Sequence, residues 1–487
     1  MSTIVVSNRL PVVVESRKDG LRTRPGSGGL VTALSAVLRR AKGRWIGWPG
    51  LFDARPASVR RVLKEAAKSE GHGLVPVHLD ADDYRGFYEG FSNEIVWPLF
   101  HDLPSRCNFD PDYWASYLAV QEKFADVVAA EAKSGDLVWV HDYQLMGVGQ
   151  CLRERKLRAR LCFFLHIPFP APDIFAKLPW RTEILQSLLR YDVVGLQTAR
   201  DLGNFLDCVK RLLPEAQQRL DDGRSIVAFE QQRTVCGAFP IGIDWNEFVD
   251  VARSVTAEVR VAQLREDMRG QQVVLGVDRL DYTKGIPDRL HAFHHALRRY
   301  PELRRKATLI QVVVPSREKV PEYATLRSQI ERAVSQVNGE FGQPGWTPIQ
   351  YLFRNLPRRE LIAYYRLADV ALVTPLKDGM NLVAKEYCAC QVDGNGVLIL
   401  SEFAGAADQL GVGAILVNPY DRERMADAIR RAVLLPLDPR RAAMRRLRRR
   451  VRKEDVHHWV GRFLSAVAYA GGRRRSGARS TRRGGGE

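Results

Sequence analysis

Short runs of apolar, often β-branched residues alternate with longer amphipathic stretches along most of the chain. Leu137–His141 and Val273–Val277 have the length and composition of buried strands. Trp114–Ala132 and Ile286–Arg299 instead repeat apolar residues at helical spacing. This alternation is typical of βαβ units, in which helices connect parallel strands. The sequence therefore predicts an α/β protein.

The same pattern runs through both halves of the chain. The other predicted strands are Thr3–Ser7, Trp45–Trp48, Leu74–Leu79, Arg160–His166, Val193–Gln197, Thr308–Val314, Val370–Thr374 and Val397–Ser401. The other predicted helices are Leu30–Arg40, Tyr323–Val337, Arg359–Leu367 and Arg422–Leu434. A chain of 487 residues exceeds what one hydrophobic core usually holds. We therefore predict two doubly wound, Rossmann-like domains facing a deep cleft, with the break near Phe239–Ile243.

Positive charge is concentrated at the C-terminal end. Residues 440–487 contain sixteen Arg or Lys and three acidic residues, so most of the net charge of +18 lies there. We expect domains at 1–240 and 241–455, a helix at 456–470 that packs back toward the first domain, and a disordered basic tail at 471–487. Weak binding of the tail to nucleic acid or to an acidic surface is the alternative to a solvated appendage.

Composition also indicates a cellular compartment. No apolar run approaches the roughly 20 residues of a membrane helix, and the N-terminus lacks the pattern of a secretion signal. The seven cysteines form no CxxC pair and several lie in apolar runs. We expect buried, reduced thiols, neither zinc nor disulfides, no membrane partner and a cytoplasmic location.

The motif Arg279-Leu280-Asp281-Tyr282-Thr283-Lys284-Gly285 directly follows a predicted strand. Two cations at the carboxyl end of a strand suit a diphosphate that gains charge as it leaves. Arg279 would otherwise form an ion pair with Asp278 or Asp281. A later segment, residues 378–386, passes from a strand through a glycine loop into a helix. Its first amides suit a phosphate or sugar, and Asp378 and Glu386 suit hydroxyl groups.

A weaker signal lies near the N-terminus, where Gly26-Ser27-Gly28-Gly29-Leu30 precedes a predicted helix. Glycines there permit close approach of a ligand to the backbone. A simple turn and helix cap explains the segment equally well. It is not a GxGxxG motif, and no acidic residue follows a second strand as a nicotinamide cofactor would require.

Twelve longer segments resemble the trehalose-6-phosphate synthases and occur in the order of that family, from residue 4 to about 406. They are VVSNRLPV, GGLVTAL, FYEGFSNEIVWPLFH, VWVHDYQLM, FFLHIPFP, FPIGID, RLDYTKG, PSREKVPEY, VNGEFG, GWTPIQYL, LVTPLKDGMNLVAKEY and LILSEFAGAA. The resemblance implies a GT-B fold and a retaining glucosyltransferase that moves glucose from a nucleotide-glucose to glucose 6-phosphate. We expect UDP-glucose as the donor, with GDP-glucose and ADP-glucose as the alternatives. A relative with another phosphorylated acceptor, such as glycerol phosphate or a cyclitol phosphate, and a non-catalytic sugar-phosphate sensor are the alternatives.

The resemblance also implies roles for particular residues. The catalytic residues would be Asp142, His166, Arg279 and Lys284. The donor would be bound by Gly28, Gly29, Arg279, Lys284, Leu356, Asp378, Gly379, Met380, Asn381, Leu382, Val383, Ala384, Lys385 and Glu386. The acceptor would be bound by Arg9, Tyr88, Trp97, Asp142 and Arg317. Arg9 and Arg317 would meet on the acceptor phosphate when the domains close.

Retention implies either a carboxylate nucleophile or transfer on one face of the sugar. The matched residue near the anomeric carbon is His166, so we expect front-side transfer. The chain has Gln144 where the family often has histidine, and Leu356 where the nucleobase is expected. Asp80-Ala81-Asp82 resembles the DxD metal motif of another glycosyltransferase fold, but we read it as a solvated loop. We therefore expect no metal and no other cofactor.

Overall fold

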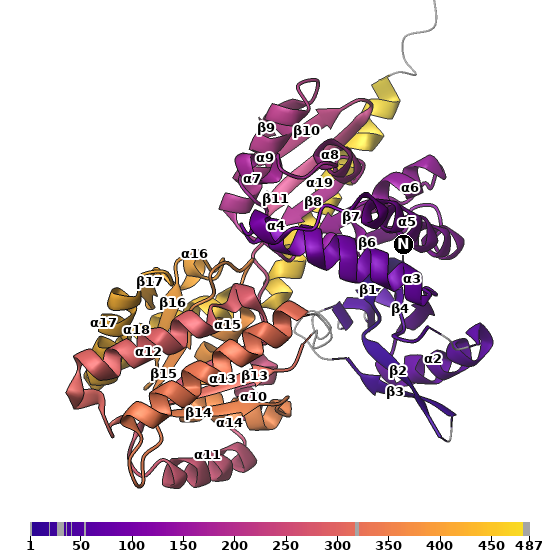
Figure 1. Cartoon of the computed structure of the whole chain (residues 1–487). Coiled ribbons are helices and arrows are strands. Elements are labelled where there is room, and N and C mark those ends of the chain that lie inside the picture. The colour runs from indigo at the N-terminus through magenta and orange to yellow at the C-terminus, as the bar shows by residue number, and fades with distance from the viewer. Residues whose placement is uncertain are drawn as a thin grey trace, which may run out of the picture. The chain divides into compact units, whose positions relative to one another are not determined.

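The computed structural model describes residues 2–18, 20–26, 34–35, 37–39, 41–52, 55–316 and 321–480. The chain forms two compact units: residues 1–240 together with 459–487 make unit 1, and residues 241–458 make unit 2. Each unit is built around its own sheet (Figure 1). The prediction of an α/β fold with parallel sheets is confirmed.

The sheet of unit 1 has nine strands in the order β5-β4-β1-β6-β7-β8-β11-β10-β9. Their bounds are β1 (Thr3–Arg9), β4 (Arg44–Trp48), β5 (Gly73–Pro76), β6 (Leu137–His141), β7 (Arg160–Phe164), β8 (Val193–Leu196), β9 (Gln217–Asp221), β10 (Arg224–Phe229) and β11 (Gln232–Ala238). In this order, every pair of neighbours from β5 across to β11 is parallel. Strand β10 is antiparallel to both of its neighbours, β11 and β9. A separate hairpin joins β2 (Val12–Arg17) to β3 (Gly20–Pro25).

Helices accompany this sheet along the whole of unit 1. They are α2 (Pro56–Glu70), α3 (Ala81–Asp83), η1 (Tyr84–Val96), α4 (Trp97–Phe100), η2 (Pro104–Arg106), α5 (Pro111–Glu131), η3 (Tyr143–Leu145), α6 (Val148–Glu154), α7 (Pro172–Phe175), α8 (Arg181–Leu188), α9 (Ala199–Leu212) and α19 (Val456–Ser480). The C-terminal helix α19 packs on the sheet through aromatic side chains. Phe463 stacks on Trp139 of β6 with ring centres 4.4 Å apart, and Trp459 lies 5.2 Å from the same indole.

Unit 2 contains a six-stranded, all-parallel sheet in the order β14-β13-β12-β15-β16-β17. The strands are β12 (Gln272–Arg279), β13 (Ala307–Val314), β14 (Ile349–Phe353), β15 (Val370–Val373), β16 (Val397–Ser401) and β17 (Ile415–Val417). The helices are α10 (Trp245–Ala252), α11 (Val255–Asp267), η4 (Tyr282–Lys284), α12 (Ile286–Arg299), η5 (Pro301–Leu303), α13 (Pro321–Phe341), α14 (Arg358–Leu367), α15 (Leu382–Cys390), α16 (Ala407–Leu410), α17 (Arg422–Leu434) and α18 (Leu437–Lys453).

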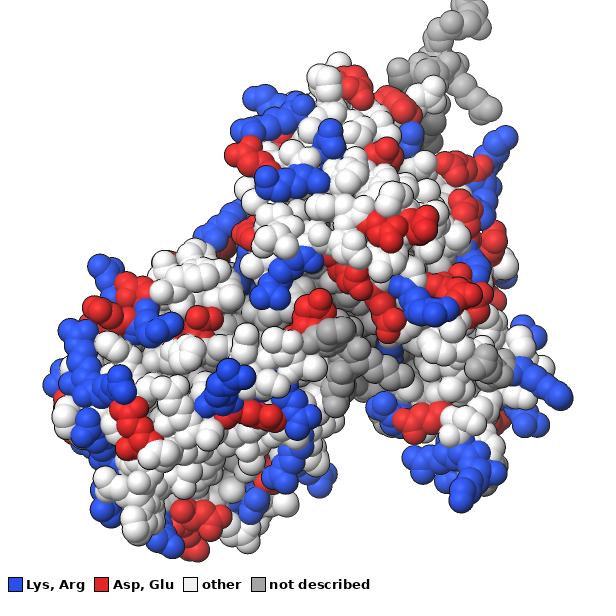
Figure 2. Space-filling model, viewed as in Figure 1, with Lys and Arg blue, Asp and Glu red and all other residues white. Residues whose placement is uncertain are grey.

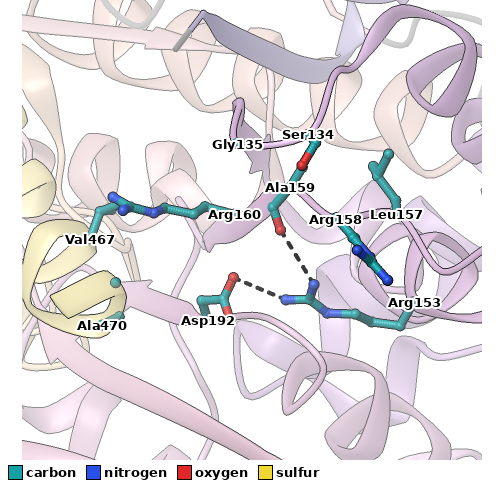
Figure 3. A pocket seen from close by; sticks show the side chains of 11 residues that line it. Ser134, Gly135, Arg153, Leu157, Arg158, Ala159, Arg160, Asp192, Val467 and Ala470 are labelled. Atoms are coloured by element: carbon teal, nitrogen blue, oxygen red, sulfur yellow. Dashed lines mark hydrogen bonds and ion pairs between the residues drawn. The ribbon is translucent and has the colours of Figure 1, made fainter. Parts of the chain in front are cut away.

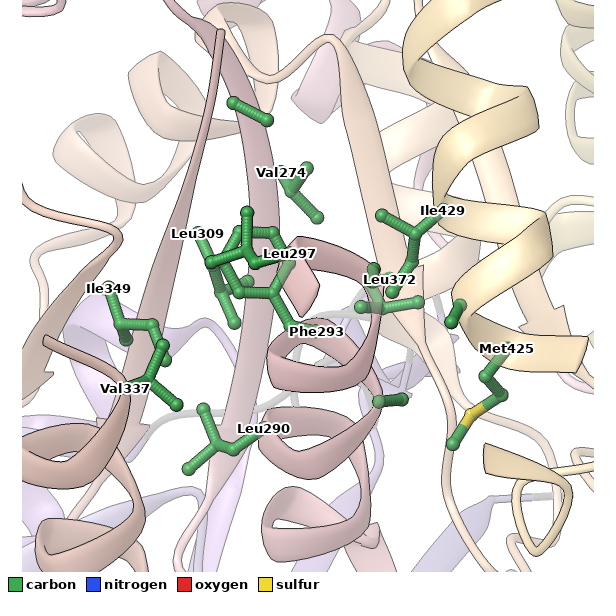
Figure 4. Close-up of a cluster of buried hydrophobic side chains, with 14 of the residues drawn as sticks. Val274, Leu290, Phe293, Leu297, Leu309, Val337, Ile349, Leu372, Met425 and Ile429 are labelled. Atoms are coloured by element: carbon green, nitrogen blue, oxygen red, sulfur yellow. The ribbon is translucent and has the colours of Figure 1, made fainter. Parts of the chain in front are cut away.

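The core of unit 2 forms where helices α12, α13 and α17 cover the sheet (Figure 4). Phe293 and Leu297 of α12 pack among the strand residues Leu309 and Leu372, and Ile429 of α17 completes this layer. All five side chains are fully buried. Parallel sheets need such cover because their strands are apolar on both faces.

Several elements differ from the sequence prediction. The hairpin β2–β3 and the strands β9, β10, β11, β14 and β17 were not predicted. Strand β9 shows why: four of its five residues, Gln217–Leu220, are exposed, so no alternating apolar pattern marks it. Helix α19 reaches Ser480 and so includes part of the predicted disordered tail. The arginines at 471–480 favour a helix and the three glycines there do not, but a helix that has already formed extends more readily than a new one starts.

Candidate active site

The strand order places a topological switch point in each sheet. In unit 1 the chain runs from β1 outward through β4 to β5, and later from β6 outward through β7 and β8 on the other side. In unit 2, β12 leads to β13 and β14 on one side, and β15 leads to β16 and β17 on the other. Open α/β sheets bind ligands beyond the carboxyl ends of strands at such points. The neighbours β1 and β6, and β12 and β15, therefore mark two candidate binding sites.

Arg9 is the last residue of β1, at the switch point of unit 1. Its guanidinium carbon lies 4.9 Å from the ring centre of Trp48 and 5.9 Å from that of Tyr88. The Nη2 group also donates to the hydroxyl of Tyr84 over 3.4 Å. Aromatic faces attract a cation and restrict its position. Arg9 is thus an exposed cation that its neighbours hold ready for an anion.

Sequence reasoning named Arg9 and Tyr88 but missed their aromatic neighbours. Tyr84 lies between Trp48 and Tyr88, with ring centres 5.0 Å and 4.9 Å away respectively. Burial raises the pKa of Tyr84 to about 12, so its hydroxyl stays neutral and keeps its proton. One signal was available: Trp48 ends the predicted strand that pairs with β1, which places it beside Arg9.

Tyr88 belongs to η1, a π-helix of 13 residues. A Cβ on Gly90 of this helix would lie 2.5 Å from the ring of Tyr113 in α5, so glycine permits the two helices to approach closely. π-Helical turns occur frequently at functional sites. Trp97 begins the next helix, where it is buried against His101 with ring centres 4.2 Å apart. The contact of Trp97 with a sugar stays a prediction.

Asp142 follows β6 directly and has the unusual backbone angle φ 74°. Its Oδ1 accepts hydrogen bonds from the backbone N–H of Tyr143 over 3.0 Å and of His166 over 3.2 Å. Non-glycine residues with positive φ are costly and gather at functional sites. The structure therefore brings Asp142 and His166 together at the carboxyl ends of the adjacent strands β6 and β7.

His166 is also joined to a second histidine that sequence reasoning had not named. Its Nε2 lies 3.1 Å from Nδ1 of His141, the last residue of β6. Burial lowers the pKa of His166 to about 3, and burial together with the neighbouring His166 lowers the pKa of His141 well below its ordinary value. Both imidazoles are therefore neutral at physiological pH.

At the switch point of unit 2, the loops after β12 and β15 are joined by an ion pair. Nζ of Lys284 lies 2.6 Å from Oδ2 of Asp378, and Nδ2 of Asn381 donates to the same oxygen over 3.1 Å. The backbone N–H of Leu376 donates to the carbonyl of Thr283. Two predicted donor-binding residues 94 positions apart in sequence thus lie in direct contact.

Arg279 ends β12 and pairs with Asp281, one of the two partners left open by the sequence. Its Nη2 lies 3.1 Å from Oδ2 of Asp281, while Oδ1 of that carboxylate accepts hydrogen bonds from the backbone and hydroxyl of Thr283. Asp281 is buried, whereas 41% of the Arg279 side chain is exposed. Asp281 therefore holds the loop together and leaves part of the guanidinium accessible to a ligand.

Helix α15 begins beside the ion pair of Lys284 and Asp378. Asn381 adopts the left-handed conformation with φ 77° and caps the helix, because its Oδ1 accepts from the N–H of Ala384 over 3.2 Å. Other first-turn amides of a helix have no acceptor within it and favour anionic groups. Further along, Glu386 accepts a hydrogen bond of 2.9 Å from the hydroxyl of Tyr365, and burial raises the pKa of this carboxyl.

Lys385 differs from the other residues predicted to bind the donor, because its side chain bonds to the protein itself. Its buried ammonium donates to the carbonyl oxygen of Ile241 over 2.6 Å. The side chain therefore binds to the start of unit 2, and the predicted contact of Lys385 with the donor would involve its backbone. Leu356 is buried in the connection from β14 to α14, and its contact with a nucleobase stays a prediction.

Gly28, Gly29 and Arg317 lie outside the described residues. Asp80, Ala81 and Asp82 are exposed, as expected, but Ala81 and Asp82 lie in the short helix α3 instead of a loop. Asp80 caps this helix in a reciprocal capping box with Asp83, and Asp82 pairs with Arg85. Gln144 is buried and its carbonyl accepts from Gln121, so it serves the packing of α5.

A cavity of about 360 Å³ in unit 1 contains none of the predicted site residues (Figure 3). It lies at the amino-terminal ends of β6 and β7, where Arg153 pairs with Asp192 over 2.9 Å. Within the described ranges, no three His, Cys, Asp or Glu side chains are grouped as metal ligands would be. No helix in these ranges has the length and apolar character that crossing a membrane requires.

Comparisons with known proteins agree with this geometry. The model of glycosyltransferase family 20 matches residues 1–469. Trehalose-6-phosphate synthase of Mycolicibacterium smegmatis is 44% identical over 474 residues, which cover 96% of this chain and 92% of the relative. The E. coli enzyme bound with UDP-2-fluoro glucose has a TM-score of 0.86 and 34% identity, covering 96% and 99% of the two chains. A UDP-forming synthase from Burkholderia xenovorans in complex with glucose-6-phosphate has a TM-score of 0.85 and 32% identity, covering 96% and 100%.

Two doubly wound units with polar groups at their switch points define a glycosyltransferase of the GT-B type. The chain belongs to glycosyltransferase family 20. The resemblance seen in the sequence motifs is therefore confirmed over nearly the whole chain.

Proposed function

We propose that this chain transfers glucose from UDP-glucose to glucose 6-phosphate, forming α,α-trehalose 6-phosphate and UDP. The observation that carries the proposal is the placement of cations at both switch points: Arg9 in unit 1, and Arg279 and Lys284 in unit 2. Both substrates are phosphate esters, which such cations bind. Solved relatives contain UDP-2-fluoro glucose and glucose-6-phosphate, which correspond to the two substrates.

In the donor site, Lys284 and Arg279 would bind the diphosphate. Each cation is already held by a carboxylate, Asp378 or Asp281, so little side-chain entropy remains to be lost on binding. The first amide N–H groups of α15 would donate hydrogen bonds to oxygens of the nucleotide-sugar, and Glu386 would bind hydroxyl groups. As the C1–O bond breaks, negative charge grows on the diphosphate and the two cations stabilise it.

We infer that glucose is transferred on the face from which UDP leaves. A double displacement would need a carboxylate nucleophile below the anomeric carbon. The residue that the family places there is His166. Its imidazole is neutral because burial lowers its pKa. In the front-side route, the acceptor oxygen bonds to C1 as the bond to the phosphate oxygen breaks. That phosphate oxygen takes the proton of the acceptor hydroxyl, and Asp142 orients the acceptor.

The acceptor phosphate would be bound by Arg9 and the hydroxyl of Tyr88. Arg9 suits this role because guanidinium binds phosphate through two parallel hydrogen bonds, and its position is set by Trp48 and Tyr84. Arg317 would be a second phosphate ligand by its family position. We place the reaction in the cytoplasm, where thiols stay reduced; six of the seven cysteines are buried free thiols.

A product assay tests the proposal directly. The protein is incubated with UDP-, GDP- or ADP-glucose and with glucose 6-phosphate, glucose or glycerol 3-phosphate, and the products are identified by mass spectrometry and NMR. We expect α,α-trehalose 6-phosphate from UDP-glucose and glucose 6-phosphate. A product made equally well from glucose or glycerol 3-phosphate would contradict the assigned acceptor, although the donor site would stand.

Replacement of the acceptor cation gives a second, more local test. Arg9→Ala removes one bidentate partner of a doubly charged phosphate and should raise the KM for glucose 6-phosphate about ten- to hundredfold. The KM for UDP-glucose should change little. Arg85→Ala is the matched control, because Arg85 is a nearby exposed arginine that pairs with Asp82. Equal effects of the two variants would remove Arg9 from the acceptor site.

A further inference from the structure

The histidine pair at the carboxyl ends of β6 and β7 has a defined geometry. Nδ1 of His141 and Nε2 of His166 are 3.1 Å apart, and the two rings are inclined by only 24°. His141 is completely buried, whereas the ring of His166 is partly accessible. Within the described part of the chain, the side chain of His166 makes its hydrogen bond through Nε2 alone. Its Nδ1 is therefore the nitrogen that a ligand can reach.

A hydrogen bond between two neutral imidazoles contains one proton, which belongs to either ring. Burial lowers the pKa of both histidines, so a doubly protonated ring is not expected at neutral pH. Two arrangements follow. Either His141 donates from Nδ1 and His166 is protonated on Nδ1, or His166 donates from Nε2 and its Nδ1 is a bare acceptor.

The surroundings of His141 decide between these arrangements. Its Nε2 is buried without a hydrogen-bond partner, and the indole of Trp139 and the ring of Phe164 lie beside the imidazole at centre distances of 4.8 Å and 6.4 Å. If His166 were the donor, His141 would have to be protonated at this apolar position. Buried N–H groups without an acceptor are rarer than buried acceptors without a donor. A bare lone pair on Nε2 of His141 is therefore the favoured state.

We propose that His141 is a positioning residue that donates its Nδ1–H to His166, and thereby fixes His166 as the tautomer with a proton on Nδ1. His166 then offers a hydrogen-bond donor to an oxygen of the transferred glucose. The second part rests on the proposed function, whereas the first concerns the free protein. The hydrogen bond made by one ring nitrogen of a histidine commonly determines whether the other nitrogen is protonated.

Nitrogen-15 NMR of the free protein tests the tautomer. In protein labelled with nitrogen-15 histidine, protonated and bare ring nitrogens give well-separated signals. The chain has ten histidines, so the signals of His166 are assigned by their loss in His166→Gln. We expect protonated Nδ1 and bare Nε2 in both His166 and His141. A proton on Nε2 of His166 would overturn the proposal, whatever the enzyme's activity.

Kinetics of His141 variants test the consequence. His141→Phe keeps an aromatic ring but removes the donor, so we expect the signals of His166 to shift toward protonation on Nε2 and kcat/KM for UDP-glucose to fall roughly ten- to hundredfold. The KM for glucose 6-phosphate should change much less. His141→Asn places an amide near the position of Nδ1 and should restore part of the loss. An unchanged tautomer and unchanged kcat/KM in His141→Phe would refute the positioning role.

A matched control separates this effect from the loss of any buried histidine. His72 is also buried, its Nε2 also lacks a hydrogen-bond partner, and its ring lies against Trp45 instead of His166. His72→Phe should leave the His166 signals and kcat/KM unchanged. If the wild-type tautomer is as expected but no glucose is transferred, the proposed function fails and the hydrogen bond stands.

Discussion

Arg289 is a fully buried cation that contacts the loop after β12, in which Lys284 lies. It pairs with Asp278, donates to Thr374 at the end of β15 over 3.1 Å, and donates to the backbone carbonyl of Lys284 over 3.3 Å. A Cβ on Gly276 would lie 2.8 Å from its Nη1, so only glycine leaves room for the guanidinium. One side chain thus connects the ends of β12 and β15 beneath Lys284. No local pattern indicates this role, because Arg289 lies in an ordinary amphipathic helix.

The donor cations allow a test at single residues. Arg279→Ala and Lys284→Ala should each lower kcat more than they raise the KM for glucose 6-phosphate, because charge on the diphosphate grows in the transition state. A charge-assisted hydrogen bond contributes about 1.5–3 kcal/mol, so a loss of at least tenfold in kcat/KM for UDP-glucose is expected. Steady-state kinetics with both substrates varied measure this. Near-normal turnover in both variants would exclude the two cations from the donor site.

Because Lys385 is buried, we expect the stability of the folded protein to depend on pH. Burial lowers its pKa to about 7, against 10.5 for an exposed lysine. Between these values the unfolded chain binds a proton that the folded chain does not, so the contribution of Lys385 to the free energy of unfolding rises with pH. The Tm of the wild type, relative to that of Lys385→Met, should therefore increase from pH 7 to pH 9.5. A constant difference would show that the folded protein keeps the ammonium charged.

Among the elements, helix α18 accounts for part of the basic C-terminal stretch. Arg440 is buried and donates to the carbonyls of Ala432, Val433 and Leu435 at the end of α17. Arg448 donates to the carbonyl of Cys388 near the end of α15 over 3.0 Å. The last carbonyls of a helix lack partners within it and favour cations. These arginines therefore complete neighbouring helices, and they are not an accessible surface for nucleic acid.

Removal of one such cap should destabilise unit 2. Arg440→Leu leaves buried carbonyls at the end of α17 without their donor, which costs about 1–3 kcal/mol. We expect a lower Tm by differential scanning calorimetry. Arg445→Leu is the control, because Arg445 lies on the same helix but is exposed. Similar Tm values for the two variants would show that the cap contributes no stability.

At the scale of the whole molecule, the net charge of +18 does not form one basic surface on the face shown in Figure 2, where acidic and basic side chains alternate. Helix α19 is anchored to unit 1 by Trp459 and Phe463, which precede the final basic residues. Deletion of residues 472–487 removes six arginines but neither of these aromatic anchors. We therefore expect the truncated protein to have unchanged transferase turnover. Any salt-sensitive retention of the full chain on immobilised nucleic acid should be weaker after truncation. Loss of turnover on truncation would make this segment part of the enzyme.

The sequence by itself determined the elements whose pattern is local and the motifs that precede binding sites. Strand β6 and helix α12 have the predicted bounds, because apolar periodicity reflects burial of one face or of the whole segment. The positions of Arg9, Asp142 and Arg279 at strand ends follow from the same pattern. Family motifs then supplied roles that periodicity cannot provide.

Only the tertiary structure decided which of these side chains meet. The contacts of Lys284 with Asp378 and of His141 with His166 join residues at or beyond the ends of different strands, and their partners depend on the order of strands in each sheet. The contact of the buried Lys385 side chain with Ile241 likewise could not be predicted from its motif. Ion pairs and hydrogen bonds form between groups that are close in space, whereas a sequence specifies only order along the chain. Strand order and packing determine which distant residues become neighbours.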